Sequence, residues 1–176
     1  MKERPIILNT EMVKAVLEGR KTQTRRIIKP QPKWIGNPNI PFKTIDADPK
    51  GIINCPYGQV GDRLYVRETW CKPDDEVFYR AQHDMQPEEH ALWDGRWKPS
   101  IHMLKKYARI WLEITDIRVE RVQDISEEDA QKEGIEFSKD FKARVGFIHL
   151  WEKLYKNWNV NPWVWVIEFK KQEDRK

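Results

Sequence analysis

The stretch from Gly61 to Trp70, with the sequence GDRLYVRETW, alternates between two kinds of side chain. Leu64 and Val66 fall on one face together with Glu68 and Trp70, while arginines and other polar side chains fall on the opposite face. A period of two residues predicts a β-strand with one buried face. A carboxylate on that face is costly unless it finds a partner, so Glu68 is a candidate functional residue.

Upstream of this strand, the sequence predicts a short strand and a helix. Residues 5–8 (PIIL) are apolar, and Asn9 or Thr10 can cap a helix whose apolar side chains recur at helical spacing as far as Leu17. Gly19 stands where a left-handed residue commonly ends a helix. Residues 29–57 hold six of the eleven prolines, without periodicity, and predict a long irregular insertion.

Downstream, Glu76 to Ala81 predicts a short partner strand, and the following residues to Lys98 are an acidic insertion. Residues 108–122 predict two strands, with a turn at Thr115 and Asp116. Ser126 begins a predicted short helix with acidic residues in its first turn, and Gly134 ends it.

A second helix and a final strand complete the pattern. Spacings of three and four predict a helix whose core-facing stripe is Phe141, Val145, Ile148, Trp151 and Tyr155. The run 163–169 (WVWVIEF) is β-branched and aromatic, which predicts a central strand. We therefore expect an α+β fold, a curled sheet or small barrel with two or three flanking helices. The 176 residues predict one domain, 1–176, with insertions at about 29–57 and 82–98.

Composition excludes several classes of protein. The chain has 39% hydrophobic residues and nine tryptophans, which argues against intrinsic disorder. Its longest apolar run, residues 163–167, is far too short to cross a membrane. The first residues do not form a secretory signal, and the two cysteines match neither a CxxC pair nor a disulfide framework, so we expect reduced thiols and a cytoplasmic protein.

The net charge of +4 conceals blocks of opposite sign. Residues 1–34 carry nine Lys or Arg and three Glu, a net of +6, whereas residues 74–95 carry −6 and residues 123–140 carry −5. Clusters of like charge decide which partner a surface tolerates. The amino-terminal part is therefore where we expect an anionic ligand.

The basic segment from Gly19 to Arg26, GRKTQTRR, is the first candidate for chemistry. If extended after Lys21, it directs Thr24 and Arg26 to one side. Desolvation and nearby positive charge lower the pKa of a lysine and make it a base or a nucleophile. The plainer alternative is a solvated basic turn. For Glu68 the alternative is a structural salt bridge, with Lys21 or Arg26 as the expected partner.

Three motifs together resemble the ASCH domain family, whose members are small PUA-like β-barrels. The first is Gly19-x-Lys21-x-x-Thr24-x-Arg26; the others are CPYG at 55–58 with the strand 61–70, and NPWVWV at 161–166. The longer matches resemble the branch common in bacteriophages and prophages, which implies the cytoplasm of a bacterial host.

The resemblance implies a pocket that holds RNA, a nucleotide or a modified base. One small bacterial ASCH member is an amidohydrolase that removes the acetyl group of N4-acetylcytidine with a lysine, a threonine and a glutamate, which match Lys21, Thr24 and Glu68 here. In the implied mechanism Lys21 takes a proton from Thr24 or from a water, and the activated oxygen attacks the acyl carbon. Glu68 orients Lys21 or passes the proton to the leaving amine, and Arg26 stabilises the developing charge.

Aromatic and polar side chains are expected to add ligand contacts, because a base stacked on an aromatic ring contributes about 1–3 kcal/mol. The candidates are Arg25, Trp70, Trp93, Trp97, Ser100, His102 and Trp163. The histidines and cysteines form neither an HExxH motif nor a metal-binding cluster, so we expect no metal and no cofactor.

Three classes of function remain open at this point. They are a hydrolase of an acylated nucleoside or of RNA, including a ribonuclease such as another ASCH member is described to be; a non-catalytic binder of RNA or a modified base; and a phage assembly protein. Binding of RNA would weaken steeply with salt, because phosphate contacts release counterions.

Overall fold

The computed structural model describes residues 1–32, 54–72, 75–82, 96–136 and 141–172. A curled five-stranded sheet has the order β1-β3-β6-β7-β2. Its strands are β1 (Glu3–Ile7), β2 (Gln23–Ile27), β3 (Arg63–Arg67), β6 (Trp111–Arg121) and β7 (Trp163–Lys171). Three α-helices accompany it: α1 (Thr10–Leu17), α2 (Glu127–Lys132) and α3 (Ala143–Tyr155). The fold is therefore α+β, and the sheet is curled and open, since β1 and β2 end the strand order and do not pair with each other.

The described residues also form a second, two-stranded sheet and several 3-10 helices. The small sheet pairs β4 (Trp70–Cys71) with β5 (Phe78–Tyr79), so the predicted partner strand within 76–81 is present. The 3-10 helices are η1 (Arg80–Gln82), η3 (Ser100–His102), η4 (Lys105–Tyr107), η5 (Val122–Asp124) and η6 (Trp158–Val160).

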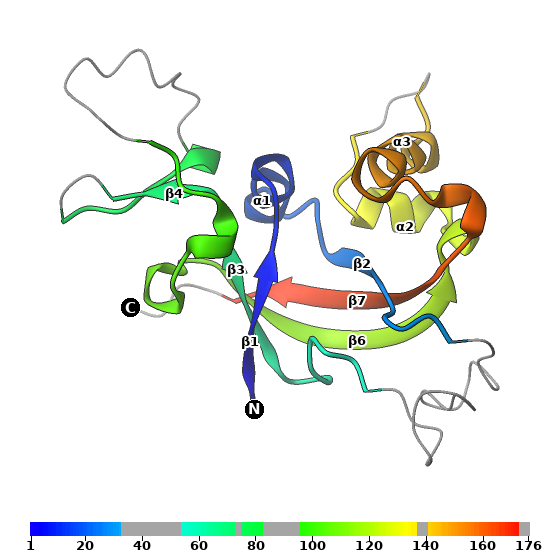
Figure 1. The fold of residues 1–176 in the computed structure, drawn as a ribbon, viewed down its shortest axis with the longest axis horizontal. Helices are drawn as coiled ribbons and strands as arrows, with labels where there is room; N and C mark the ends of the chain where they lie inside the picture. The colour runs from blue at the N-terminus through cyan, green and yellow to red at the C-terminus, as the bar shows by residue number, and fades with distance from the viewer. Residues whose placement is uncertain (33–53, 73–74, 83–95, 137–140, 173–176) are drawn as a thin grey trace.

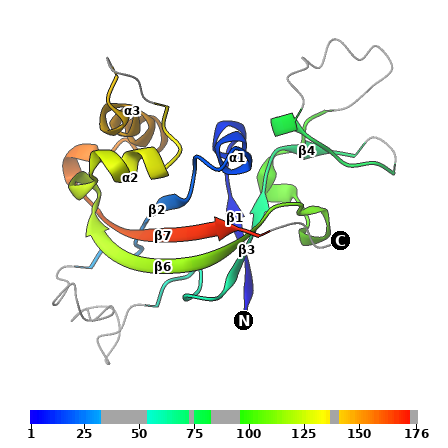
Figure 2. The ribbon, with the colours of Figure 1, turned by 180° about the vertical axis from the view of Figure 1, so that it is seen from behind.

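Helix α1 lies on one face of β7 and helices α2 and α3 lie on the other, because Ile167 packs with α1 whereas its neighbour Val166 packs with α2 and α3. In the views of Figures 1 and 2, strands β6 and β7 curve beneath the three helices. Strand β4 and helix α3 lie at opposite ends of the molecule. Side chains of α1, β2 and α3 line a common cavity.

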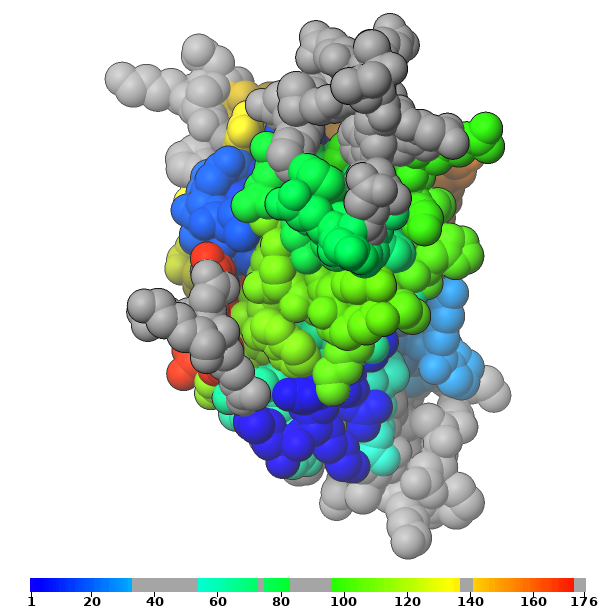
Figure 3. Space-filling model, turned by 90° about the vertical axis from the view of Figure 1, so that its left-hand side faces the viewer, coloured from blue at the N-terminus to red at the C-terminus, as the bar shows by residue number. Residues whose placement is uncertain are grey.

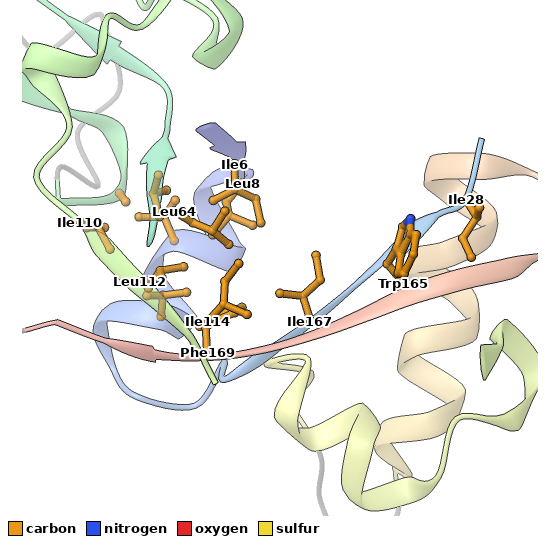
Figure 4. Packing of buried hydrophobic residues seen from close by; sticks show 14 residues of the cluster. Ile6, Leu8, Ile28, Leu64, Ile110, Leu112, Ile114, Trp165, Ile167 and Phe169 are labelled. Carbon is orange, nitrogen blue, oxygen red and sulfur yellow. The ribbon is translucent and has the colours of Figure 1, made fainter. Parts of the chain in front are cut away.

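The main core is the layer between the sheet and α1. Strand residues such as Leu64, Leu112, Ile114 and Ile167 meet in it (Figure 4), and Val13 and Val16 of α1 pack against them. Each of these six side chains is at most 1% exposed. Burying an aliphatic side chain of this size contributes about 1.5–3 kcal/mol, so the contact fixes α1 on the sheet.

The predicted ends of α1 and α2 are confirmed. Asn9 accepts a hydrogen bond from the Met12 amide, and Ser126 accepts one from the Asp129 amide. Both caps satisfy an amide that the first helical turn leaves without a backbone partner. Gly19, after α1, has a φ of +76°, the left-handed conformation that favours glycine.

Two predictions of the fold are wrong. Residues 111–121 form one long strand, and the expected turn at Thr115 and Asp116 is a shift of register between Ile114 and Asp116. The long partner β7 pairs with both halves of β6, so the extra residue forms a bulge without reversing the chain. In α3, the buried side chains are Ala143, Phe147 and Trp151, whereas Phe141 and Val145 of the predicted stripe are each 43% exposed.

Strand β7 lies between β6 and β2, which confirms the prediction of a central strand. Both cysteines are free thiols, as expected. No helix in the described ranges has the length and apolar character needed to cross a membrane.

Candidate functional site

A cavity of about 260 Å³ lies between the β1–α1 turn, the start of β2 and the inner face of α3. Its polar lining consists of Asn9, Lys21, Thr24, Arg25, Arg26 and Glu133. Its apolar lining comes largely from α3, with Phe147, Leu150, Trp151, Leu154 and Tyr155. One wall is therefore charged and the opposite wall is apolar and aromatic, which is the usual composition of a small-molecule site.

Lys21 is buried at the base of this cavity, with 3% of its surface exposed. Its ammonium donates to the backbone oxygens of Gln23 (2.7 Å) and Glu133 (2.8 Å) and to the Glu133 carboxylate (2.8 Å). These bonds use all three donors of the ammonium. Burial lowers the pKa of Lys21, Glu133 opposes this effect, and the positive charges of Arg26 and Arg25 add to the lowering. Lys21 is therefore buried with a lowered pKa, which contradicts the interpretation of this segment as a solvated basic turn.

Glu133 is the carboxylate that sequence reasoning missed. It follows the last residue of α2, is 4% exposed, and precedes the left-handed Gly134, whose φ is +85°. A Cβ on Gly134 would lie 2.8 Å from the Cβ of Ala15 and 2.9 Å from that of Lys21. The available signal in the sequence was the pair Glu133-Gly134, an acid beside a glycine that ends a helix.

Arg25 connects this pair to a network of acids. Its guanidinium is fully buried and lies within 3.3 Å of oxygens of Glu120, Asp129 and Glu133. Arg118 extends the network by binding Asp129 at 3.2 Å. Arg25, which was expected to contact a ligand, lines the cavity, but its guanidinium is ion-paired with these carboxylates.

Thr24 and Arg26 reach the cavity from β2. Thr24 is 3% exposed and pairs with Ile167 in the sheet. Arg26 is half-buried and donates to the carbonyl of Ile7 at 2.8 Å. The cavity therefore brings together Lys21, Thr24, Arg25 and Arg26 of the predicted site.

Glu68 has a different partner from the one expected. It is buried at 1% exposure, as the alternation predicted, but Arg109 binds both of its oxygens at 2.8 and 2.9 Å. Arg109 also lies over the ring of Tyr79, 4.2 Å from its centroid. Glu68 is not among the residues that line the cavity, and neither Lys21 nor Arg26 pairs with it among the described contacts.

The predicted stacking and hydrogen-bonding residues that the structure describes lie outside the cavity. Trp70 is 5% exposed and packs on Tyr107, while Trp97 is half-buried beneath Arg80. Trp163 packs under the guanidinium of Arg121, 4.1 Å from the ring centroid. In η3, Ser100 is half-buried and His102 is exposed, and Trp93 lies outside the described residues. The five of these six residues that the structure describes do not line the cavity.

No group of His, Cys, Asp and Glu in the described part of the chain has the arrangement of a metal site. The acids near the cavity are instead paired with buried cations, as Glu133 and Asp129 show. The chemistry available there is that of a lysine, a carboxylate, a hydroxyl and an arginine.

Two solved structures show low similarity to the chain. One is an ASCH domain from Lactobacillus crispatus JV V101, with 15% identity, coverage of 97% of this chain and 79% of that chain, and a TM-score of 0.43. The other is a protein of the DUF984 family from Enterococcus faecalis V583, with 11% identity, coverage of 100% and 83%, and a TM-score of 0.47. No family model and no curated protein matches the chain.

Proposed function

We propose that this protein is an ASCH-type domain whose cavity binds a modified nucleoside, free or within RNA. The observation that carries the proposal is the buried Lys21, which shares one cavity with Thr24, Arg26 and an aromatic wall. A volume of about 260 Å³ is slightly below the range of about 300–1,000 Å³ typical of drug-sized ligands and suits a single nucleoside. Tyr155 and Leu154 would pack on the planar base while the polar wall binds its exocyclic groups.

The motif resemblance supports the same ligand class. The segment Gly19 to Arg26 contributes Lys21, Thr24 and Arg26 to the cavity, so the part of the motif that defines the family is the part that lines the site. Membership of the phage branch is a further proposal that rests on residues 55–58, 61–70 and 161–166.

A catalytic role is the second candidate, and the Lys21–Glu133 contact favours it. We propose that Glu133, in place of Glu68, supplies the carboxylate of the expected Lys/Thr/Glu set, because Glu133 is 2.8 Å from the lysine and also lines the cavity. Transfer of a proton from the buried ammonium to Glu133 would leave a neutral amine, which low polarity favours.

The neutral Lys21 would then take a proton from a water held by Thr24. The water oxygen would attack the acyl carbon of an N-acyl base, and the carbon–nitrogen bond would break as the leaving amine takes a proton from Lys21 or Glu133. Hydrolysis of N4-acetylcytidine by this route consumes one water and yields cytidine and acetate. Arg26 would stabilise the negative charge on the acyl oxygen.

The experiment is a titration of the protein with N4-acetylcytidine and with cytidine, followed by intrinsic tryptophan fluorescence. Saturable binding that Lys21→Met and Thr24→Val each weaken at least tenfold supports the proposal. The matched comparison is Glu68→Gln, which changes a buried carboxylate outside the cavity and should leave binding unchanged. Absence of saturable binding to either nucleoside would refute the binding proposal.

Chromatography of the same mixtures separates binding from turnover. Release of cytidine that Glu133→Gln abolishes and Glu68→Gln preserves would assign hydrolysis to the Lys21–Glu133 pair. The reverse pattern would return the carboxylate role to Glu68, and binding without release would leave the protein a binding module.

A further inference from the structure

The sheet face opposite α1 carries a surface that the cavity does not use. In β3, Leu64 and Val66 point into the core, so Arg63, Tyr65 and Arg67 point outward. In the sheet register, Tyr65 lies beside Pro5 of β1 and beside Trp111 of β6. The space-filling view shows the amino-terminal segment and the green segment that follows residue 96 meeting on this side of the molecule (Figure 3).

The centre of this surface is a pair of aromatic rings bordered by a cation. The rings of Tyr65 and Trp111 lie 5.8 Å apart, and the ammonium of Lys105 lies 5.8 Å from the centroid of the Trp111 ring. Both rings are half-buried, with an accessible part facing outward. Aromatic rings beside cations on an open sheet face are a common platform for stacking the bases of single-stranded nucleic acid.

The segment beside the rings is cationic. Residues 96–109 hold five Lys or Arg and no acid. Lys105 pairs with Glu3, and Arg109 binds Glu68, whereas the ammonium groups of Lys98 and Lys106 lie over the rings of Trp70 and Tyr107. Exposed apolar side chains lie among them, with Ile101 56% and Leu104 55% exposed. Positive charge interspersed with apolar surface suits a ligand that has both phosphates and bases.

A row of contacts joins this surface to the cavity. Arg26, which lines the cavity, donates to the Ile7 carbonyl, and Ile7 is the register neighbour of Arg67. Arg67 in turn donates to the carbonyl of Ile101, which belongs to the cationic segment 96–109. The row therefore leads from the cavity across β1 and β3 to the outer surface.

We propose that this outer face, defined by Tyr65, Arg67, Lys105 and Trp111, binds the stretch of single-stranded RNA that flanks a nucleoside held in the cavity. The inference rests on the proposed function in one respect, the nucleoside in the cavity. It adds that the physiological ligand is a polymer, whose backbone runs over Arg67 toward Lys105 and whose neighbouring bases stack on Tyr65 and Trp111.

The test measures fluorescence anisotropy of a labelled single-stranded RNA of about twelve nucleotides, a length within the usual range of such sites. The variant Lys105→Glu with Lys106→Glu changes two exposed side chains outside the cavity. We expect its affinity for the RNA to fall at least about tenfold and the slope of log K against log salt to fall by about 1.4, for two phosphate contacts on a single strand. The matched control, Lys142→Glu with Lys153→Glu, reverses two exposed charges on the α3 side and should bind as the parent protein does.

Trp111→Leu tests the stacking component. It should weaken binding of the RNA by about tenfold while binding of heparin, a polyanion without bases, stays unchanged. Because Lys105 and Lys106 are exposed, their variant remains informative if Trp111→Leu fails to fold. Equal affinities of the Lys105/Lys106 variant and the α3 control would overturn the proposal, as would equal losses of RNA and heparin binding in Trp111→Leu.

Failure of this inference and failure of the proposed function give different results. If N4-acetylcytidine binds the cavity and the Lys105/Lys106 variant binds RNA normally, only the outer face is wrong. If RNA binding depends on Lys105, Lys106 and Trp111 but no nucleoside binds, the outer face stands and the cavity proposal falls.

Discussion

The carboxylate of Glu133 lies 2.8 Å from the ammonium of Lys21, although 112 positions separate the two residues in the sequence. Its other oxygen lies 3.3 Å from the buried guanidinium of Arg25. One carboxylate thus balances two buried cations and joins the end of α2 to the beginning of β2. Loss of this group should therefore affect both stability and ligand binding.

Glu133→Gln keeps the shape of the side chain and removes its charge. We expect the free energy of unfolding to fall by about 3 kcal/mol, because breaking a buried ion pair leaves the cations uncompensated. Urea denaturation measures the change, and Glu136→Gln is the control, since Glu136 is 88% exposed and lies 3.9 Å from Arg20. A loss no larger than that of the control would contradict the role given to Glu133.

Lys21→Met should show a distinctive dependence of stability on pH. Burial lowers the pKa of Lys21 below its usual value of 10.5, so between the folded pKa and 10.5 the unfolded chain binds more protons at this site than the folded one. The parent protein therefore gains stability from this group as the pH rises through that window, and Lys21→Met lacks the gain. Urea denaturation of both proteins at neutral pH and near pH 10 measures this gain, as the difference in free energy of unfolding between the parent and the variant at each pH. A parent-minus-variant difference that is constant, or that falls with pH, would show that the pKa is not lowered.

Gly134→Ala tests the close approach between α2, α1 and Lys21. An added Cβ would meet Ala15 and Lys21 at 2.8 and 2.9 Å, whereas a Cβ on Gly19 would meet nothing within 4 Å. Both glycines have a positive φ, so Gly19→Ala measures the backbone cost alone, about 1 kcal/mol. We expect Gly134→Ala to cost about 1–3 kcal/mol more, as overpacking usually does. Equal shifts of the two denaturation midpoints would mean that the contact relaxes without cost.

Arg109→Met tests whether the Glu68 ion pair is structural. Glu68 is 1% exposed and Arg109 is its partner for both oxygens, so the variant leaves a buried charge and should lower the free energy of unfolding by about 3–5 kcal/mol. Adding Glu68→Gln removes that charge and should recover part of the loss. If the double variant is no more stable than Arg109→Met, the bidentate pair does not form.

The sequence predicted the elements whose cause is local. The alternation of β3, the cap at Asn9, the glycine at 19 and the apolar run of β7 each depend on a few neighbouring residues, and each is present in the structure. The turn expected at Thr115 failed because a pairing partner far along the chain, β7, decides whether a polar pair bends the strand or forms a bulge.

The candidate site divides in the same way. The sequence predicts Lys21, Thr24 and Arg26 as a group, because they lie on one strand or in the two residues before it. All three line the cavity. Their carboxylate partner is not, because an inward-facing Glu68 and a helix-ending Glu133 are equally plausible until the fold places Arg109 beside one and Lys21 beside the other. Which buried charges pair depends on tertiary contacts, and the spacing of residues in the sequence does not predict it.

The central position of β7 has a consequence for biosynthesis. Strand β2 is translated early, yet its sheet partner is β7, with Gln23 opposite Glu168 and Ile27 opposite Val164. On the ribosome β2 therefore has no neighbour in the sheet until residues 163–171 have emerged, and β6 offers an unpaired edge during the same interval. Such non-local pairings form slowly, and exposed strand edges invite aggregation. A nascent chain interrupted before Trp163 would carry both unpaired edges and be a natural client for chaperones and proteases.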